Sequence, residues 1–338
     1  MQNSPLLGLT LGELSNLATT MELPAFAAKQ MAGWLYKKRV KSIEEMTNLS
    51  VATRLKLSEK YEVGCSAPVK FQQSKDETIK YLFRTSGKQY VETVYIPDED
   101  RATLCVSTHV GCKMNCLFCM TGKQGFSGNL TAAEILNQIQ SVPESQSLTN
   151  IVFMGMGEPL DNIVELFKVL EILTSEYAYA WSPKRITVST IGLLPGLQAF
   201  LENSHCHLAV SLHTPFEDER LKLMPVEKAS PLRKVLELVR KYDFAHQRRV
   251  SFEYIMFNGL NDGLYHAREL VRLLSGIPCR VNLIRYHVIP GIDLPSSDPQ
   301  KMVLFRDFLT SKGIICTIRA SRGEDILAAC GMLSTQNS

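Results

Sequence analysis

The chain has 338 residues, of which 45% are hydrophobic and 21% are charged. This composition excludes a disordered or fibrous protein, and the length allows one large core with a small accessory domain. The sequence has no run of about 18 uncharged apolar residues, and its N-terminal segment lacks the basic-then-apolar order of a signal peptide. We therefore expect a cytoplasmic protein without membrane contact. The net charge of +3 is too small to indicate a nucleic-acid partner by itself.

Residues 1–62 are expected to form a small helical domain. Thr10 and Glu13 have the spacing of a capping box, and Ser50 is placed to cap a later helix. Positive charge is concentrated between residues 29 and 60, where three glutamates accompany eight basic residues: Lys29, Lys37, Lys38, Arg39, Lys41, Arg54, Lys56 and Lys60. Such a run is most often a solvated helical surface, and contact with phosphates is the alternative.

Residues 63–100 contain short alternating stretches, which predict an antiparallel β extension or linker. From residue 101 to 338, apolar β-rich runs alternate with helical patterns at 131–140, 161–174 and 231–242. The expected strands are ATLCVS, NIVFMG, RITVST, HLAVSL, RVSFEYIM, RVNLI and IICTIR. Helix starts are marked by Thr131 with Glu134, and by Ser230 followed by Pro231.

This alternation is typical of an α/β protein with a parallel sheet. Six or seven units are too few for an eight-stranded barrel, so we expect an open partial (β/α)6 barrel. Its active site should lie at the carboxyl ends of the strands.

Cys112, Cys116 and Cys119 form a C-x3-C-x2-C pattern in the loop after the first expected core strand. In a reducing cytosol, such a group indicates metal binding or catalysis rather than disulfides. Three thiolates can hold a 4Fe-4S cluster and leave one iron open to a ligand. A zinc site with His109 as the fourth ligand is the alternative.

C-x3-C-x2-C is also the signature of the radical S-adenosylmethionine superfamily, and Phe118 is the aromatic residue often found before the last cysteine. GMGEP at 155–159 resembles the superfamily's GGE-type segment, whose backbone and Glu158 would hold the methionine amino group. An isolated Gly-Pro cluster is more often a simple turn. Its place one βα unit after the cysteines favours a functional segment.

The resemblance extends over nearly the whole chain. RATLCVSTHVGCKMNCLFCMTGKQGF, VETVYIP, GMGEPL, ITVSTIG, AVSLH, VNLI and IRASRGEDILAACG resemble the RlmN/Cfr family of radical rRNA adenine-C-methylating enzymes, and most closely its RlmN branch. KQMAGWLYKKRVKSIEEMTNLS is similar to that family's accessory domain, which implies that the basic stretch contacts RNA.

The resemblance implies a 4Fe-4S cluster and two S-adenosylmethionine molecules per turnover. The implied cofactor-binding residues are Gly157, Glu158, Ser189, Ser211, Leu212, His213 and Asn282. The implied catalytic residues are Cys330, Cys105 and Glu92. Taken without the resemblance, free cysteines are usually small buried hydrophobes, a reading that we keep for Cys65, Cys206, Cys279 and Cys316. For Glu92 the alternative is an exposed strand glutamate.

The implied chemistry uses a protein sulfur as a methyl carrier. Cys330 as a thiolate takes a methyl group from one S-adenosylmethionine. A second molecule is reductively cleaved, and its 5'-deoxyadenosyl radical removes a hydrogen atom from the methyl group of the methylated thioether, so that a carbon radical adds to adenine. Cys105 then removes the ring proton and forms a transient disulfide with Cys330 as product leaves.

The family resemblance leaves the target carbon open. We expect carbon 2 of an adenine in 23S rRNA, with tRNA as a further candidate substrate, because that is the housekeeping reaction. Carbon 8, the antibiotic-resistance target of Cfr-type members, is the alternative. A flavodoxin- or ferredoxin-like electron donor and a monomer are also expected.

Two segments depart from the family pattern. Arg285, Tyr286 and His287 follow VNLI, where Pro-Tyr-Asn is common, and MTGKQGF follows the cysteines. Two other functional classes remain as alternatives. One is a zinc-stabilised RNA-binding module without activity, and the other is a radical enzyme with a non-RNA substrate.

Overall fold

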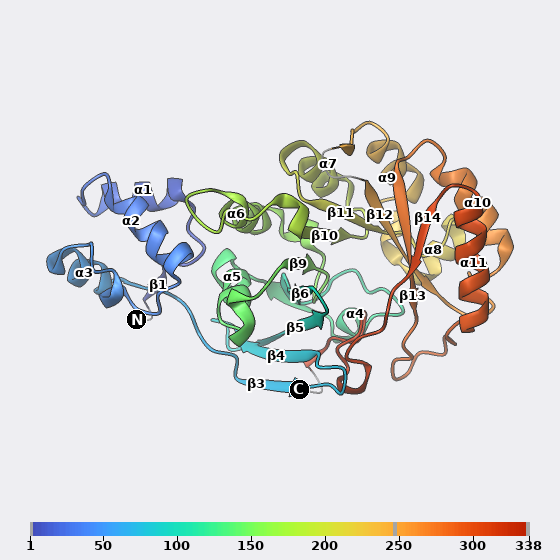
Figure 1. Cartoon of the computed structure of the whole chain (residues 1–338), viewed down its shortest axis with the longest axis horizontal. Helices are drawn as coiled ribbons and strands as arrows, with labels where there is room; N and C mark the ends of the chain where they lie inside the picture. The colour runs from blue at the N-terminus through green and yellow to red at the C-terminus, as the bar shows by residue number, and fades with distance from the viewer. Residues whose placement is uncertain (1–2, 246–248, 336–338) are drawn as a thin grey trace.

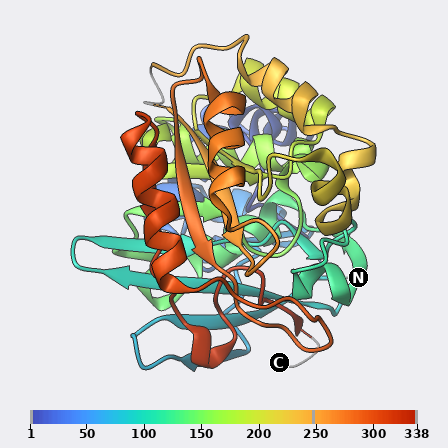
Figure 2. The ribbon, with the colours of Figure 1, turned by 90° about the vertical axis from the view of Figure 1, so that its right-hand side faces the viewer.

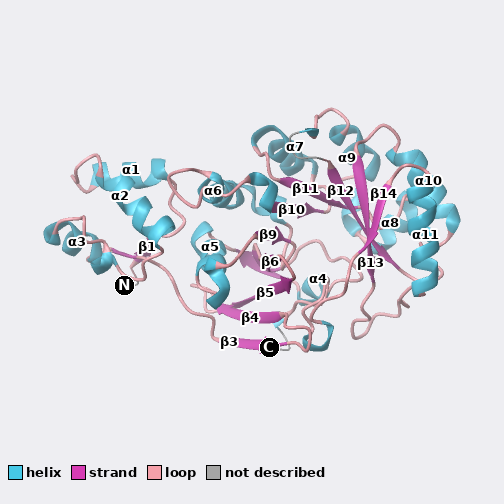
Figure 3. Ribbon diagram, in the orientation of Figure 1, coloured by secondary structure: helices cyan, strands magenta, loops and turns pink. Residues whose placement is uncertain are grey.

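A twisted sheet of ten strands runs through most of the molecule (Figures 1 and 3). The structure is a computed structural model that describes residues 3–245 and 249–335. Seven neighbouring strands of the sheet are parallel: β6 (Arg101–Cys105), β9 (Asn150–Phe153), β10 (Ile186–Thr190), β11 (His207–Ser211), β12 (Val250–Met256), β13 (Cys279–Arg285) and β14 (Ile315–Ile318). Six helical crossovers join them, and the edge strands β3 and β14 do not pair within the described residues. The expected open partial barrel is confirmed.

The crossover helices cover the outer face of the parallel strands (Figure 2). They are α5 (Ala132–Gln140), α6 (Ile163–Thr174), α7 (Leu194–Asn203), α8 (Glu217–Leu223), α9 (Leu232–Val239), α10 (Leu264–Leu274) and α11 (Pro299–Ser311). Their buried faces are mostly apolar, with buried polar side chains in α5 and the buried Arg220 in α8, and the Thr131 capping box of α5 is present as predicted. None of the described helices is both long and apolar enough to cross a membrane.

The start of α9 differs from its prediction. The helix begins at Leu232 with Pro231 as its N-cap, and the Ser230 hydroxyl instead accepts a hydrogen bond from the Leu194 N–H at 3.4 Å. The Leu232 N–H donates to the buried Glu227 carboxylate at 3.0 Å. A carboxylate from the preceding 3-10 turn has therefore replaced the expected serine cap, because tertiary packing brings it to the free N–H groups of the helix.

The N-terminal region is helical, as expected, and packs against α5 and α6 (Figure 1). It contains α1 (Leu11–Thr20), α2 (Ala27–Ala32) with a following π-helical turn (Gly33–Lys38), and α3 (Val51–Ser58), with the short strands β1 (Ser4–Pro5) and β2 (Tyr61–Glu62). Gly8 has φ +88°, and a Cβ there would lie 2.4 Å from the Ala133 nitrogen. Lys168 of α6 also pairs with Glu13 of α1 at 2.8 Å.

The predicted antiparallel meander is confirmed as β3 (Lys70–Gln73), β4 (Ile79–Arg84) and β5 (Tyr90–Asp98). β5 pairs antiparallel with β6, so these strands continue the sheet of the barrel. A separate hairpin, β7 (His109–Gly111) with β8 (Phe126–Asn129), encloses the cysteine loop and α4 (Met120–Gln124). The remaining 3-10 turns are Ile43–Glu45, Pro143–Gln146, Pro159–Asn162, Pro183–Arg185, Pro225–Lys228 and Glu324–Ile326.

Candidate active site

A cavity of about 430 Å³ lies at the carboxyl ends of the parallel strands. Its wall combines the ends of β9 to β13, the loop that carries the three clustered cysteines, and the C-terminal segment, by which we mean residues 319–335. Segments far apart in the sequence meet here because the C-terminal segment turns back across the strand ends after β14. The cavity therefore lies where the partial barrel was expected to have its active site.

All three cysteines of the triplet line this cavity. Their loop is fixed by two backbone hydrogen bonds, from Leu117 N–H to the Leu223 carbonyl at 2.8 Å and from Cys112 N–H to the Gly125 carbonyl at 2.9 Å. Burial raises the pKa of the Cys112 thiol to about 12 and that of Cys116 well above its ordinary value. Thiols in such surroundings become thiolates only with a bound cation beside them, because the cation compensates for the lost hydration.

The geometry separates the cluster from the zinc alternative. Among the described residues, no three Cys, His, Asp or Glu side chains converge tightly enough to hold one ion. A cubane has no such requirement, since each cysteine binds a different iron. His109 does not line the cavity. Its Nδ1 lies 2.8 Å from the Thr108 hydroxyl, and burial lowers the pKa of its ring to about 4. The triplet therefore fits a cluster better than a three-cysteine, one-histidine zinc site.

GMGEP forms the floor of the cavity beside the cysteine loop. Gly157 has φ +100°, and a Cβ there would lie 2.2 Å from His109 Nδ1, so the position requires glycine. Glu158 is 4% exposed, and its two carboxylate oxygens accept hydrogen bonds from Ile191 N–H at 2.9 Å and Leu160 N–H at 3.1 Å. Burial raises the pKa of Glu158 to about 7 against these hydrogen bonds. A cationic amino group nearby would favour its ionised form.

The ends of β10 and β11 supply the adjoining wall. Ser189, Ser211 and His213 line the cavity, whereas Leu212 is fully buried in the core. His213 is held with φ +60°, and its Nδ1 accepts a hydrogen bond from the Ile255 N–H at 3.0 Å. Asn282 does not line the cavity: its side chain donates to Glu253 at 2.8 Å and accepts from Thr317 at 2.8 Å. The predicted cofactor residues thus divide into those at the cavity wall and two that lie behind it.

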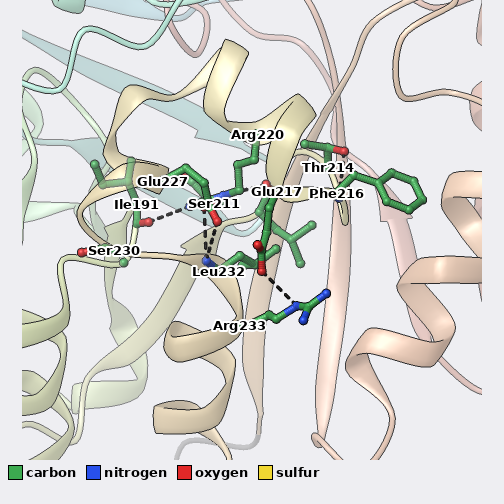
Figure 4. Close-up of polar contacts among 12 residues, drawn as sticks. Ile191, Ser211, Thr214, Phe216, Glu217, Arg220, Glu227, Ser230, Leu232 and Arg233 are labelled. Atoms are coloured by element: carbon green, nitrogen blue, oxygen red, sulfur yellow. Dashed lines mark hydrogen bonds and ion pairs between the residues drawn. The ribbon is translucent and has the colours of Figure 1, made fainter.

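A fully buried arginine ties these strand ends together (Figure 4). Arg220 of α8 donates to the carbonyls of Ile191 at 2.8 Å and Ser211 at 3.1 Å, and it forms an ion pair with Glu227. Glu227 in turn binds the start of α9, as described above. One guanidinium therefore fixes the spacing of β10, β11 and α9, and its charge opposes the rise in the pKa of Cys116.

The two remaining predicted cysteines meet in the same cavity. Cys105, at the end of β6, is buried, whereas Cys330 is exposed to the cavity. Burial, and secondly the Cys330 sulfur, raise the pKa of Cys105 to about 12. The Gly331 carbonyl accepts a hydrogen bond of 2.7 Å from Met120 N–H, directly after the last cysteine of the triplet. The C-terminal sulfur therefore lies beside the cysteine triplet.

Glu92 differs from the expected alternative. It is 1% exposed on β5, so it is not an exposed strand glutamate. Its carboxylate pairs with Lys80 at 3.0 Å and accepts a hydrogen bond from Ser334 N–H at 2.9 Å. It does not line the cavity. The position links the antiparallel strands to the C-terminal segment.

Two family models match parts of the chain. Residues 4–63 match the ribosomal RNA large subunit methyltransferase N-terminal domain, and residues 106–271 match the radical SAM superfamily. A probable dual-specificity RNA methyltransferase RlmN of Parabacteroides distasonis is 68% identical over 330 residues, which cover 98% of this chain and 96% of that protein. The chain belongs to the RlmN family.

More distant relatives share the whole RlmN-family architecture. The dual-specificity RNA methyltransferase RlmN of Syntrophus aciditrophicus is 39% identical over 96% of this chain and 95% of its own. A crystal structure of a radical SAM methyltransferase from Sphaerobacter thermophilus superposes with a TM-score of 0.91 at 38% identity, and covers 98% of this chain and 99% of the other. The predicted family and fold class are confirmed.

Several residues of the site were not predicted from the sequence. Glu253 and Arg319 line the cavity, and Arg220 lies behind it. A buried charge in an apolar strand, as in FEYIM, is the only signal that could have indicated Glu253. Of the four cysteines predicted to be buried, Cys206 and Cys316 are buried, whereas Cys65 and Cys279 are half-buried.

Proposed function

We propose that this chain is a radical S-adenosylmethionine-dependent RNA methyltransferase that methylates carbon 2 of an adenine in 23S rRNA and in tRNA. The observation that carries this proposal is the meeting of Cys105 and Cys330 with the cysteine triplet in one cavity. A methyltransferase that transfers the methyl group of S-adenosylmethionine directly to its substrate does not need these five cysteines in one cavity. The family membership and the names of its relatives support the same reaction.

In this proposal, Cys112, Cys116 and Cys119 would hold a 4Fe-4S cluster, since all three line the cavity. When bound, the cluster and its S-adenosylmethionine supply one-electron chemistry that can functionalise an electron-poor ring carbon. Glu158 binds the methionine amino group, and Gly157 leaves room for it. Ser189, Ser211 and His213 bind other parts of the cofactor. Leu212 and Asn282 do not line the cavity, and the Asn282 side chain instead holds Glu253.

Cys330 carries the methyl group. Its sulfur must be exposed to the cavity in order to reach the methyl donor and the base. Cys105 removes the proton from the methylated ring carbon, and its sulfur then attacks that of Cys330. The new S–S bond would form as the S–C bond to the product breaks; the released carbon would take up a proton to become the methyl group, and the unpaired electron of the radical adduct would pass to a one-electron acceptor. We assign Glu92 to positioning, since it holds the backbone of Ser334, near Cys330, from outside the cavity.

We further propose a division into residues 1–62 as an RNA-contacting domain, residues 63–100 as an antiparallel extension and residues 101–338 as the catalytic barrel. Six of the basic residues are exposed: Lys29, Lys37, Lys38, Lys41, Lys56 and Lys60. Arg39 instead donates to the Ser145 carbonyl at 2.8 Å, so it anchors this region to the barrel. We also propose a cytoplasmic monomer that is reduced by a flavodoxin- or ferredoxin-like donor.

An anaerobic assay tests the proposed reaction. Reconstituted protein is incubated with unmodified 23S rRNA fragments or tRNA, a chemical reductant and methyl-labelled S-adenosylmethionine, and the nucleosides are separated beside both methyladenosine standards. We expect label in 2-methyladenosine and none with Cys330→Ala. Label in 8-methyladenosine would instead identify the Cfr-type reaction, and absence of labelled RNA would contradict the proposal.

A further inference from the structure

Glu253 of β12 places an unsatisfied carboxylate oxygen at the cavity. The residue is 3% exposed and lines the cavity wall. Its Oε1 accepts a hydrogen bond from Asn282 Nδ2 at 2.8 Å, whereas its Oε2 has no hydrogen-bond partner among the described residues. A buried acceptor without a partner is costly, so a ligand that donates to it binds more tightly.

Arg319 lies next to this oxygen and also lines the cavity. Its Nη1 is 3.7 Å from Glu253 Oε2, which is too long for a hydrogen bond, and 3.6 Å from the Met154 sulfur. The backbone of Arg319 is fixed by its N–H bond to the Leu283 carbonyl at 2.8 Å. The guanidinium therefore presents donors to the cavity beside the open acceptor.

This pair lies beside the two sulfurs that would handle the substrate carbon. Glu253 and Arg319 line the same cavity as Cys105 and Cys330. A base positioned between the cysteines would consequently have its polar edge within reach of the pair. The residues assigned to the methionine amino group, Gly157 and Glu158, lie on a different strand end.

An acceptor beside a donor matches one edge of adenine. Its exocyclic amino group donates hydrogen bonds, and the neighbouring ring nitrogen accepts one. Guanine and hypoxanthine carry an oxygen at the position of the amino group, which would face the Glu253 carboxylate without a proton between them. We propose that Glu253 and Arg319 select adenine as the target base by pairing with this amino edge, an inference that rests on the proposed RNA methylation.

The test compares Glu253→Gln with the unaltered protein on three stem-loop RNAs. The target position carries adenine, purine without the amino group, or hypoxanthine. We expect Glu253→Gln to lower kcat/KM on the adenine RNA about tenfold or more and to leave the rate on the purine RNA unchanged. The new amide can donate to an oxygen, so the rate on hypoxanthine relative to adenine should rise. Glu237→Gln, an identical change on the exposed face of α9, should leave all three rates unchanged.

A second readout separates base recognition from cofactor binding. Without RNA, methylation of Cys330 measured by mass spectrometry should be the same in Glu253→Gln and unaltered protein. Loss of that methylation would show that Glu253 binds the cofactor and would overturn the inference, as would an unchanged preference among the three RNAs.

Two further results complete the test. Glu253→Asp keeps the acceptor, so it should retain the preference for adenine over purine, and loss of that preference would also overturn the inference. If the unaltered protein methylates none of the RNAs while Cys330 is methylated, then the proposed function itself fails and takes this inference with it.

Discussion

The strand ends of β10 and β11 on one side of the cavity and the C-terminal segment on the other are held by different means. The strand ends are joined by the sheet itself and by the buried Arg220 (Figure 4). The C-terminal segment lies outside the sheet and is held by side chains from several other elements, among them Glu92, which binds Ser334 as described above. Two further contacts lie on either side of Cys330 in the sequence. Asp76 accepts from Gly323 N–H at 2.9 Å, and Thr121 donates to the Leu333 carbonyl at 2.7 Å. Cys330 lies between these two attachments.

This difference matches the proposed roles of the two walls. A cofactor site gains from fixed geometry, because binding then costs little ordering of the protein. A sulfur that must face a methyl donor, a base and finally another cysteine needs some freedom of position. The comparison therefore predicts large losses of stability for changes at the strand ends and small, local ones for changes at the C-terminal segment.

The largest effect is expected from Arg220→Leu. This change leaves Glu227 buried without its ion-pair partner and removes donors from two buried carbonyls, at a cost of about 3 to 5 kcal/mol in the free energy of unfolding. Chemical denaturation measures it. Arg233→Leu is the control, since Arg233 is 73% exposed and pairs with the surface residue Glu217 at 2.9 Å. The control should cost less than about 1 kcal/mol, and equal losses in both variants would contradict the comparison.

A smaller effect is expected from Gly157→Ala. The new Cβ would clash with the His109 ring in a backbone conformation that alanine rarely adopts, which costs about 2 to 3 kcal/mol in unfolding free energy. Gly259→Ala is the matched control, because it has φ +73° with no atom within 4 Å of the added carbon. The control isolates the backbone strain of about 1 kcal/mol. Thermal and denaturant unfolding of both variants would show whether the close approach matters.

The strand-end wall should also be sensitive to acid through His213. Burial, and secondly the Arg220 charge, lower the pKa of its ring to about 3. Between pH 6.5 and pH 3 the His213 ring stays neutral in the folded protein, whereas in the unfolded chain it takes up a proton. The free energy of unfolding is therefore unaffected by this group above pH 6.5 and falls as the pH is lowered below 6.5. The loss between pH 8 and pH 5 is about 2 kcal/mol.

Denaturation at both pH values measures this loss. His213→Gln should reduce the difference between pH 8 and pH 5, and His205→Gln, at an exposed position, should leave it unchanged. A pH dependence in His213→Gln equal to that of the unaltered protein would show that other groups cause the acid sensitivity.

The smallest effect is expected at the C-terminal segment. Thr121→Val removes the donor to the Leu333 carbonyl and should lower the local opening free energy there by about 1 kcal/mol. Hydrogen exchange should therefore quicken at residues 330–335 with little change in global unfolding. Thr310→Val, which alters an exposed bond within α11, serves as the control. A global loss as large as that of Arg220→Leu would mean that both walls unfold as one unit.

Local sequence signals predicted the elements well. The seven parallel strands and the capping boxes at Thr10 and Thr131 occur where expected, because apolar runs and caps act over a few residues. The prediction for the start of α9 was wrong, because the carboxylate that binds its first N–H is brought there by tertiary packing. The burial of Glu92 was not predictable either, because strand alternation does not say which face of a sheet is covered.

Site residues divide in a similar way. The cysteine spacing and the GMGEP segment indicated one part of the cavity, because the residues that form each of these motifs are close together in the sequence. Glu253 and Arg319 are 66 residues apart and become a pair only when β12 and β14 lie on either side of β13. Glu253 lies in an expected strand and Arg319 in the IRASRGEDILAACG string, but the sequence assigned neither a role, so only the folded chain shows them together.

The open sheet has a consequence for how the reaction is shielded. A closed eight-stranded ring would surround a small substrate with protein on all sides, whereas here β3 and β14 remain separate edges among the described residues. In the proposed reaction, the bound RNA would cover part of the cavity that the protein leaves open. Bound RNA would then exclude solvent from the cavity in which it reacts, and solvent would reach the sulfurs of Cys105 and Cys330 whenever no RNA is bound.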